Sequence, residues 1–409
     1  MEDEKNALAN NLFFSKEAAE YLGISVQRLA VLTKERKIIP LKKNSSGTIY
    51  HIDELEKRKN ELSIFSSKEE ISGEQAGMFK INTSTRWEAL NLAVTMNILH
   101  VSEKKACMLI DSLDSRIVCE PMLENSHKWE KLLNVTMDVM KTEYDYAKLA
   151  FSHLRETDEI IRIGEPAYPK LLKETEEAPR FLYLRGRISL LQDIRTVALV
   201  GSRQAGEEGK RNTERVARIL GSNGIIIVSG LAKGIDVTAH KAALNSGFST
   251  IAVIGTNLNQ YYPSENMEVQ KRIEKEGLVV SQFSPATKTE RWFFPLRDGV
   301  MSGLSQATVI MEAGETSGAL KQARYALKQK RLVLIPQNAF NIPSIKWPEK
   351  FEKKGAIRVK NPSEIIEILS KHRVYHLERQ RNEITYDLFN DDKMIVADAS
   401  GEYSEKSKQ

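Results

Sequence analysis

The chain has 409 residues, which at roughly 100 to 200 residues per domain predicts about two or three domains. Hydrophobic residues make up 41% and charged residues 28%, a balance that excludes a disordered or fibrous chain. The formal net charge of +5 is too weak over this length to indicate a polyanion partner, so the positions of the basic residues matter more.

Several classes of protein are excluded by what the chain lacks. The longest apolar runs are strand-sized and fall far short of the ~20 residues that cross a bilayer. The first nine residues are acidic and polar, unlike a secretory signal. Cys107 and Cys119 form neither a disulfide framework nor a CxxC metal motif. We therefore expect a cytoplasmic protein that neither binds a membrane nor needs a metal or cofactor.

Residues 1–62 are typical of a winged helix-turn-helix. Ser15 is placed to cap a first helix, and Gly23 supplies a turn. The second helix, Val26–Lys34, directs Leu29 and Leu32 toward a core. Residues 41–52 carry the turn sequence NSSG between short apolar strands, which predicts a hairpin, and a helix over 53–62 closes the unit. This order resembles the winged domains of MerR and excisionase-like proteins.

The basic residues of this unit fall where duplex DNA would be met, on the second helix, the following turn and the wing. They are Arg28, Lys34, Arg36, Lys37, Lys42 and Lys43. The alternative is a solvated charged face on a small module that binds another partner.

Residues 63–81 are rich in Ser, Glu, Lys and Gly and lack a sustained apolar period, which predicts a linker. Residues 82–157 carry apolar spacings such as Leu90, Ala93, Met96 and Leu99, which predict a helical domain. These apolar residues are interpreted as core.

In residues 158–371 the sequence pattern changes to short apolar strands separated by helical segments. This pattern predicts an α/β fold with a doubly wound, mostly parallel Rossmann-like sheet. The predicted strands are 196–200, 225–229, 250–254, 278–282, 308–311 and 332–335, with helices that include 212–220, 237–244 and 318–327. Residues 372–409 form a charged tail that we expect to be irregular.

The unusual residues of this domain follow the strands. Gly201, Ser202 and Arg203 follow the first strand, and the run 230–236, with Gly230, Lys233 and Gly234, follows the second. Backbone N–H groups and helix dipoles at such junctions attract anions, and small residues allow close approach. The dinucleotide and P-loop patterns GxGxxG and GxxxxGK[ST] do not occur here, which argues against those ligands.

Taken together, these turns resemble the DprA/Smf DNA-processing family in order and spacing. The matching segments are YPKLL at 168–172, LYLRG at 182–186, GSR at 201–203, SGLAKGID at 229–236, His240, TIAVIG at 250–255, YPSEN at 262–266, FPLR at 294–297, SGLS at 302–305, Glu312 with Ala313, SGAL at 317–320 and GAI at 355–357. The 168–186 segments resemble those that precede the sheet in that family.

The resemblance implies single-stranded DNA binding in a basic pocket at the strand ends, by homodimers that load a RecA-type recombinase during recombination and transformation. Arg203 and Lys233 would hold phosphates, while Gly201, Ser202, Gly230 and Gly234 would shape the pocket. Asn266 and Arg297 would line or brace it. Lys321 stands where the family has a small hydroxyl residue and could add a positive charge.

Other features point elsewhere or leave alternatives open. Asp298 and Gly299 replace a usual Asn-Arg pair, which leaves room for a mobile-element or defence role. Asp236 is interpreted as a bracing carboxylate and His240 as an interior residue, and Glu312 has no accompanying nucleophile. We therefore predict no catalysis. A nucleotide sensor or nucleotide-processing enzyme on the same fold, and a ligand-responsive transcription regulator, remain the alternatives.

Overall fold

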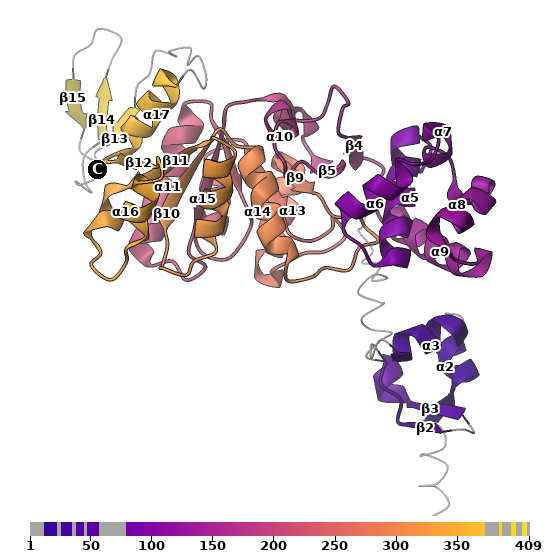
Figure 1. Cartoon of the computed structure of the whole chain (residues 1–409). Coiled ribbons are helices and arrows are strands. Elements are labelled where there is room, and N and C mark those ends of the chain that lie inside the picture. Colours follow the sequence, from indigo (N-terminus) through magenta and orange to yellow (C-terminus); the bar gives the residue numbers. More distant parts are fainter. Residues whose placement is uncertain are drawn as a thin grey trace, which may run out of the picture. The chain divides into compact units, whose positions relative to one another are not determined.

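The computed structural model describes residues 12–22, 26–34, 38–44, 47–56 and 79–372, together with 384–386, 394–397 and 403–406. The chain divides into two compact units, Met1–Gln75 and Ala76–Gln409 (Figure 1).

The first unit contains two helices and a small antiparallel sheet. Its elements are β1 (Leu12–Phe14), α2 (Ser15–Tyr21), α3 (Val26–Lys34), β2 (Lys42–Asn44) and β3 (Gly47–His51), and residues 52–56 are helical. The strands lie in the order β1-β3-β2, and Leu29, Leu32 and Tyr50 are buried in a shared core. Ser15 does not cap α2 as expected. Phe14 occupies the cap position, and the Glu17 carboxylate accepts a hydrogen bond from its N–H at 2.8 Å.

The second unit begins with a helical region, as the apolar spacings predicted. It consists of α5 (Ser84–Leu99), α6 (Glu103–Ile110), α7 (Ser115–Val118), η1 (Met122–Asn125), α8 (Ser126–Leu133) and α9 (Met137–Ser152). Leu90 and Ala93 are fully buried, while Met96 and Leu99 pack against the same core from its margin.

A nine-stranded sheet follows, in the order β12-β11-β10-β6-β7-β8-β9-β5-β4. Its strands are β4 (Glu159–Arg162), β5 (Phe181–Gly186), β6 (Thr196–Gly201), β7 (Ile226–Ser229), β8 (Thr250–Ile254), β9 (Leu278–Ser281), β10 (Ala307–Glu312), β11 (Leu332–Pro336) and β12 (Ile357–Val359). β6 to β12 pair in parallel, whereas β5 pairs antiparallel with β9 and with β4. The 182–186 segment, expected before the sheet, is therefore part of it, and the sheet is mixed but mostly parallel.

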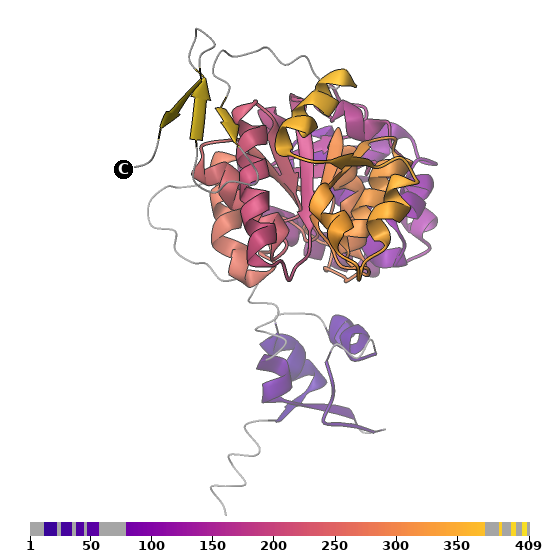
Figure 2. The same cartoon turned by 90° about the vertical axis from the view of Figure 1, so that its left-hand side faces the viewer.

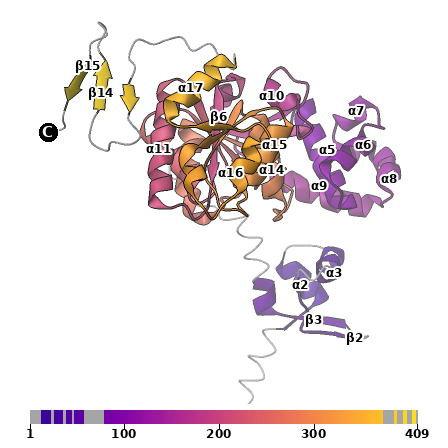
Figure 3. The same cartoon turned by 60° about the vertical axis from the view of Figure 1, so that its left-hand side comes forward.

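Helices cover both faces of the sheet (Figures 2 and 3). α11 (Glu207–Ser222), α12 (Ile235–Asn245) and α17 (Pro362–Lys371) share a core on one face, and α13 (Met267–Glu276) packs beside α12. The other face is covered by α10 (Lys170–Lys173), α14 (Phe293–Gly303), α15 (Ala319–Lys328) and α16 (Trp347–Glu352). The prediction of an α/β fold with a mostly parallel sheet between two layers of helices is confirmed.

The helical region packs against the β4 end of the sheet, at the opposite end from α16 (Figure 1). Its core is continuous with side chains of β5, β8 and β9, and the rings of Phe151 and Tyr183 meet edge to face with centroids 6.1 Å apart. Within the described residues no helix could span a membrane. The tail differs from expectation, because its described parts are three antiparallel strands, β13 (Ile384–Tyr386), β14 (Met394–Ala397) and β15 (Tyr403–Lys406).

Candidate nucleic-acid interface

The loops that follow β6, β7 and β8 meet at the carboxyl edge of the sheet and enclose a pocket of about 60 Å³ together with α14. Parallel strands bring their carboxyl ends to one edge, which is why three separated segments converge here. The pocket is lined by Arg203, Gly230, Leu231, Ala232, Lys233, Gly255, Tyr262, Pro263, Phe294 and Arg297. Four of the nine residues expected to bind DNA in this domain are therefore brought together.

Two loop glycines are required by the packing. A side chain at Gly230 would collide with the guanidinium of Arg297. Gly234 has a φ of +76°, and a Cβ there would press against the Ser202 and Arg203 carbonyls. The neighbouring Leu231 also adopts a positive φ of 57° although it is not a glycine, which marks the loop as conformationally strained.

Gly201 and Ser202 lie behind the pocket rather than in it. A Cβ at Gly201 would meet Ile235 and the Glu312 carbonyl, and the Ser202 N–H donates to that same carbonyl at 2.7 Å. The Ser202 carbonyl in turn accepts from the Ile235 N–H at 3.2 Å. These residues join β6, β10 and α12, so they shape the junction.

Arg203 and Lys233 are the exposed cations of the pocket. The Arg203 side chain is exposed and makes no hydrogen bond or ion pair with any residue that the structure describes. The Lys233 side chain is 54% exposed, and its ammonium pairs with the carboxylate of Glu265, whose side chain is 59% exposed. Ion pairs this exposed contribute little stability, so both cations are accessible to an anion.

Arg297 and Asn266 brace the pocket instead of presenting charge to solvent. Arg297 is only 4% exposed. It donates to the Val253 carbonyl at 2.9 Å, and its Nε lies 3.4 Å from an oxygen of Asp298. Asn266 is buried, and its amide donates to the Leu231 carbonyl at 2.9 Å. Asn266 thereby holds the loop that carries Lys233, and the Arg297 guanidinium packs against the same loop at Gly230.

Buried carboxyl groups lie beside these cations. Asp236 accepts from the Gly230 N–H at 3.2 Å, and burial raises its pKa against the opposing influence of Arg297. Burial also raises the pKa of Asp298 to about 6, while Arg297, Arg203 and Lys321 lower it. Lys321 is exposed in the first turn of α15 and does not line the pocket, although it is close enough to influence Asp298.

Two aromatic residues of the pocket wall, Tyr262 and Phe294, were not among the residues expected to bind DNA. Tyr262 is 52% exposed, and its ring centroid lies 5.2 Å from that of Phe294. The YPSEN and FPLR segments contained the signal, since aromatic residues next to a phosphate site are surfaces on which bases can stack.

His240 and Glu312 both have structural partners. His240 is fully buried, its Nδ1 lies 2.7 Å from the Thr250 hydroxyl, and burial lowers its pKa to about 3. The Glu312 carboxylate accepts from the Gly206 N–H at 3.2 Å at the start of α11, where it satisfies the helix end. Among the described residues no three His, Cys, Asp or Glu side chains gather as a metal site.

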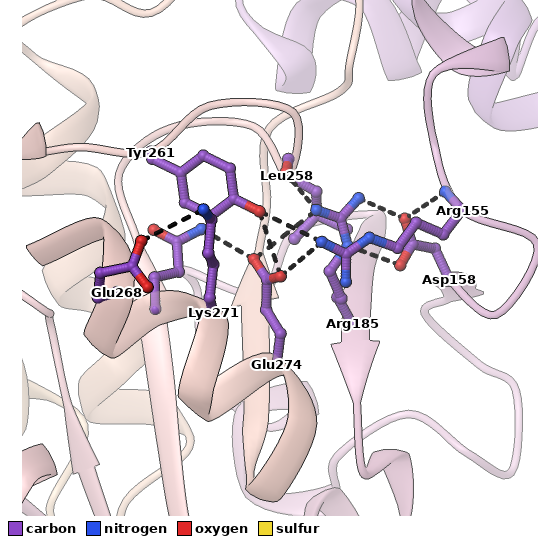
Figure 4. A network of polar contacts seen from close by, with 9 residues as sticks. Arg155, Asp158, Arg185, Leu258, Tyr261, Glu268, Lys271 and Glu274 are labelled. Carbon is purple, nitrogen blue, oxygen red and sulfur yellow. Dashed lines mark hydrogen bonds and ion pairs between the residues drawn. The ribbon is translucent and has the colours of Figure 1, made fainter. Parts of the chain in front are cut away.

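A buried polar network lies behind the loop that contributes Tyr262 (Figure 4). Arg185 pairs with Asp158 through two hydrogen bonds of 2.8 and 2.6 Å, and donates to the Leu258 carbonyl at 2.8 Å. Arg155 donates to Glu274 at 2.7 Å and to the Tyr261 hydroxyl at 3.2 Å. The network joins β5, α13 and the end of the helical region to residues 258–261.

In the first unit, Lys34 ends α3 and Lys42 begins β2, and both are exposed. Arg28 lies within α3 and Lys43 within β2. Arg36 and Lys37 lie outside the described residues, as does most of the expected linker 63–81.

The family model described as DNA recombination-mediator protein A matches residues 159–370. The chain belongs to this family. The motif resemblance is thereby confirmed, and the matched residues coincide with the sheet that carries the pocket. Proteins named Smf and DprA are similar to this chain over about half of its length.

Protein Smf of Synechocystis is 36% identical over 218 residues, which cover 52% of this chain and 53% of that protein. The DNA processing protein DprA of Bacillus subtilis is 33% identical over 219 residues, covering 53% of this chain and 73% of that protein. The crystal structure of DprA from Streptococcus pneumoniae superposes with a TM-score of 0.53 at 28% identity, covering 69% of this chain and 95% of that chain. The chain thus spans about half the length of the Synechocystis protein.

Proposed function

We propose that this protein binds single-stranded DNA in the pocket at the carboxyl edge of its sheet and does not cut it. One observation carries the proposal. Arg203 and Lys233, on the loops after two neighbouring strands, flank a single pocket whose wall includes the exposed ring of Tyr262. Membership of the recombination-mediator family supports DNA as the polyanion.

The pocket offers the two kinds of contact that an unpaired strand needs. Phosphates would be neutralised by Arg203 and Lys233, which follow the paired strands β6 and β7 and line the same pocket. Unpaired bases expose both faces and would stack on Tyr262 and Phe294. Paired bases in a duplex cannot offer those faces, which favours the single strand.

The absence of catalysis is part of the proposal, and it is supported by how the carboxyl groups are used. Asp236 accepts from the Gly230 N–H, and Glu312 accepts from the Gly206 N–H. A general base needs a substrate proton within its reach, and these oxygens are engaged with backbone N–H groups.

We also propose that residues 1–62 form a winged helix-turn-helix that contacts duplex DNA, followed by a linker over 63–81, a helical domain over 82–157, the DNA-binding α/β domain over 158–371 and a tail over 372–409. The order of two helices and a hairpin, with Lys34 and Lys42 exposed, supports this organisation. Replacing both lysines by alanine should weaken duplex binding and leave single-strand binding unchanged. Unchanged duplex binding, or weaker single-strand binding, in this variant would contradict a role of residues 1–62 in binding duplex DNA.

The family resemblance further supports a homodimer that loads a RecA-type recombinase onto the bound strand. Co-sedimentation of the full chain with such a recombinase on single-stranded DNA should show joint retention. If the recombinase is retained on the DNA equally well without this protein, a loading role would be contradicted.

The function is tested by titrating the full chain into a fluorescent oligothymidylate over a series of salt concentrations. For each phosphate neutralised, the logarithm of the affinity should fall by about 0.7 for every tenfold increase in salt concentration. Excess unlabelled duplex should not displace the single-stranded DNA from the pocket. Equal displacement by duplex, or binding that ignores salt, would contradict the proposal.

A further inference from the structure

The loop between β8 and η3 (Ser264–Asn266) supplies one wall of the pocket through Gly255, Tyr262 and Pro263. Its residues 255–263 form neither helix nor strand. The position of the Tyr262 ring therefore depends on how the loop is fastened by side chains from other elements.

The helical region fastens the loop from one side. The Asn259 amide donates to the Ala150 carbonyl of α9 at 3.1 Å, and Arg155, three residues after α9, donates to the Tyr261 hydroxyl at 3.2 Å. Both contacts come from a segment far from the pocket in sequence. Packing of the helical region on the sheet therefore has a direct connection to the loop.

The sheet and α13 fasten the loop from the other side (Figure 4). The Tyr261 hydroxyl donates to Glu274 at 3.3 Å, so it accepts from one charged group and donates to another. Arg185 holds the Leu258 carbonyl and is itself held by the fully buried Asp158. Hydrogen bonds to charged groups are stronger than those between neutral groups, so these contacts hold the loop firmly.

Tyr261 and Tyr262 differ in environment although they are adjacent. The Tyr261 side chain is engaged in the network, whereas Tyr262 is exposed beside Phe294. The two residues share a planar peptide group, so fixing one restricts the directions open to the other. The anchored hydroxyl of Tyr261 thus limits where the Tyr262 ring can point.

We infer that Tyr261 is a positioning residue for the DNA site. Its hydroxyl, held between Arg155 and Glu274, keeps the loop in the conformation in which Tyr262 presents its ring to a base. The helical region contributes to DNA affinity through this contact without touching the strand. The inference rests on the proposed function, since it requires that a base stacks on Tyr262.

Tyr261→Phe removes the hydroxyl and keeps the ring. Arg155 and Glu274 remain paired with each other at 2.7 Å, so no buried charge is left alone. Since a stacked base contributes roughly 1–3 kcal/mol, loosening one stacking surface should weaken oligothymidylate binding by about two- to five-fold. The salt slope should not change, because the number of phosphate contacts is unaffected.

The matched control is Tyr168→Phe. Tyr168 is buried, whereas Tyr261 is partly buried, and the Tyr168 hydroxyl likewise makes a hydrogen bond, to the Pro179 carbonyl at 2.7 Å. Tyr168 does not line the pocket. This variant should bind the strand as the wild type does. Thermal unfolding of both variants would show that each remains folded at the temperature of the assay.

The decisive arm combines Tyr261→Phe with Tyr262→Ala in the full chain. If Tyr261 acts through its neighbour, its substitution has no further effect once the Tyr262 ring is gone. A full additional loss in that background, or wild-type binding by Tyr261→Phe alone, would overturn the inference while leaving the proposed function intact. A wild-type chain that does not bind the oligonucleotide would instead overturn the proposed function and this inference with it.

Discussion

Two groups of basic side chains lie within the second unit, and they use their charge in opposite ways. In the network behind the pocket, Arg185 is buried against Asp158, and its charge is neutralised within the protein. In the pocket, Arg203 is exposed and makes no direct ion pair with a described carboxylate, and Lys233 pairs only with an exposed one. Buried cations hold the loops, and exposed cations remain available to a ligand.

The largest expected effect comes from breaking the buried group. Asp158→Asn leaves the Arg185 guanidinium buried with only Glu274, 3.7 Å away, as a counter-charge, and should lower the free energy of unfolding by about 3–5 kcal/mol. Chemical denaturation measures this loss. Glu352→Gln is the control, because the Glu352–Arg358 pair is also double but partly exposed, and should cost less than about 1 kcal/mol. Equal losses of unfolding free energy in the two variants would show that the buried ion pair stabilises the fold no more than an exposed one.

A smaller effect is expected from the carboxylate that pairs with Lys233. In the free protein the Glu265 carboxylate forms an ion pair with the Lys233 ammonium. A DNA phosphate that binds Lys233 must therefore replace this carboxylate. Glu265→Gln should tighten single-strand binding about two- to five-fold, the equivalent of an exposed ion pair. Glu276→Gln removes a comparably paired carboxylate at the far end of α13 and should change binding less. A similar gain from both variants would indicate a general charge effect.

The smallest effect depends on pH. Asp298 faces Arg297, Asp236, Arg203 and Lys321, and burial raises its pKa to about 6. Its carboxyl is neutral below that pH and negative above it, so strand affinity should fall by about two-fold as pH rises from about 5 to about 7.5. Asp298→Asn should remove this decline and bind more tightly only at the upper end. A decline that persists in the variant would point to Asp236, whose pKa burial also raises.

The sequence predicted the gathering of Arg203, Gly230 and Lys233 because β6 and β7 are strongly apolar, and parallel strands bring the residues that follow them to one edge. It did not predict that Arg297 would be buried. That outcome depends on the packing of α14 against the loop at Gly230, where the missing Cβ leaves room for the guanidinium.

The edge of the sheet was harder to predict. β4 and β5 lack the alternation with helices that marks the parallel strands. They pair antiparallel with each other, and β5 pairs antiparallel with β9. The contacts of Glu265 and Tyr261 could not be inferred either, since both depend on three-dimensional neighbours distant in sequence. Tyr262 and Phe294 were within reach, because they lie inside the motifs that carried the family resemblance.

The role of Arg203 and Lys233 in binding DNA is measured by the salt dependence of single-strand binding in three proteins: the wild type, Arg203→Ala/Lys233→Ala, and Lys353→Ala/Lys354→Ala. The last pair is exposed in the turn before β12, where the strand begins, and so lies at the opposite edge of the sheet. The pocket variant should lose about ten-fold or more in affinity, and its salt slope should become shallower by about 1.4, or 0.7 for each lost phosphate contact. The control should match the wild type in both quantities. Equal losses in the two variants, or unchanged binding by the pocket variant, would show that Arg203 and Lys233 do not hold the DNA.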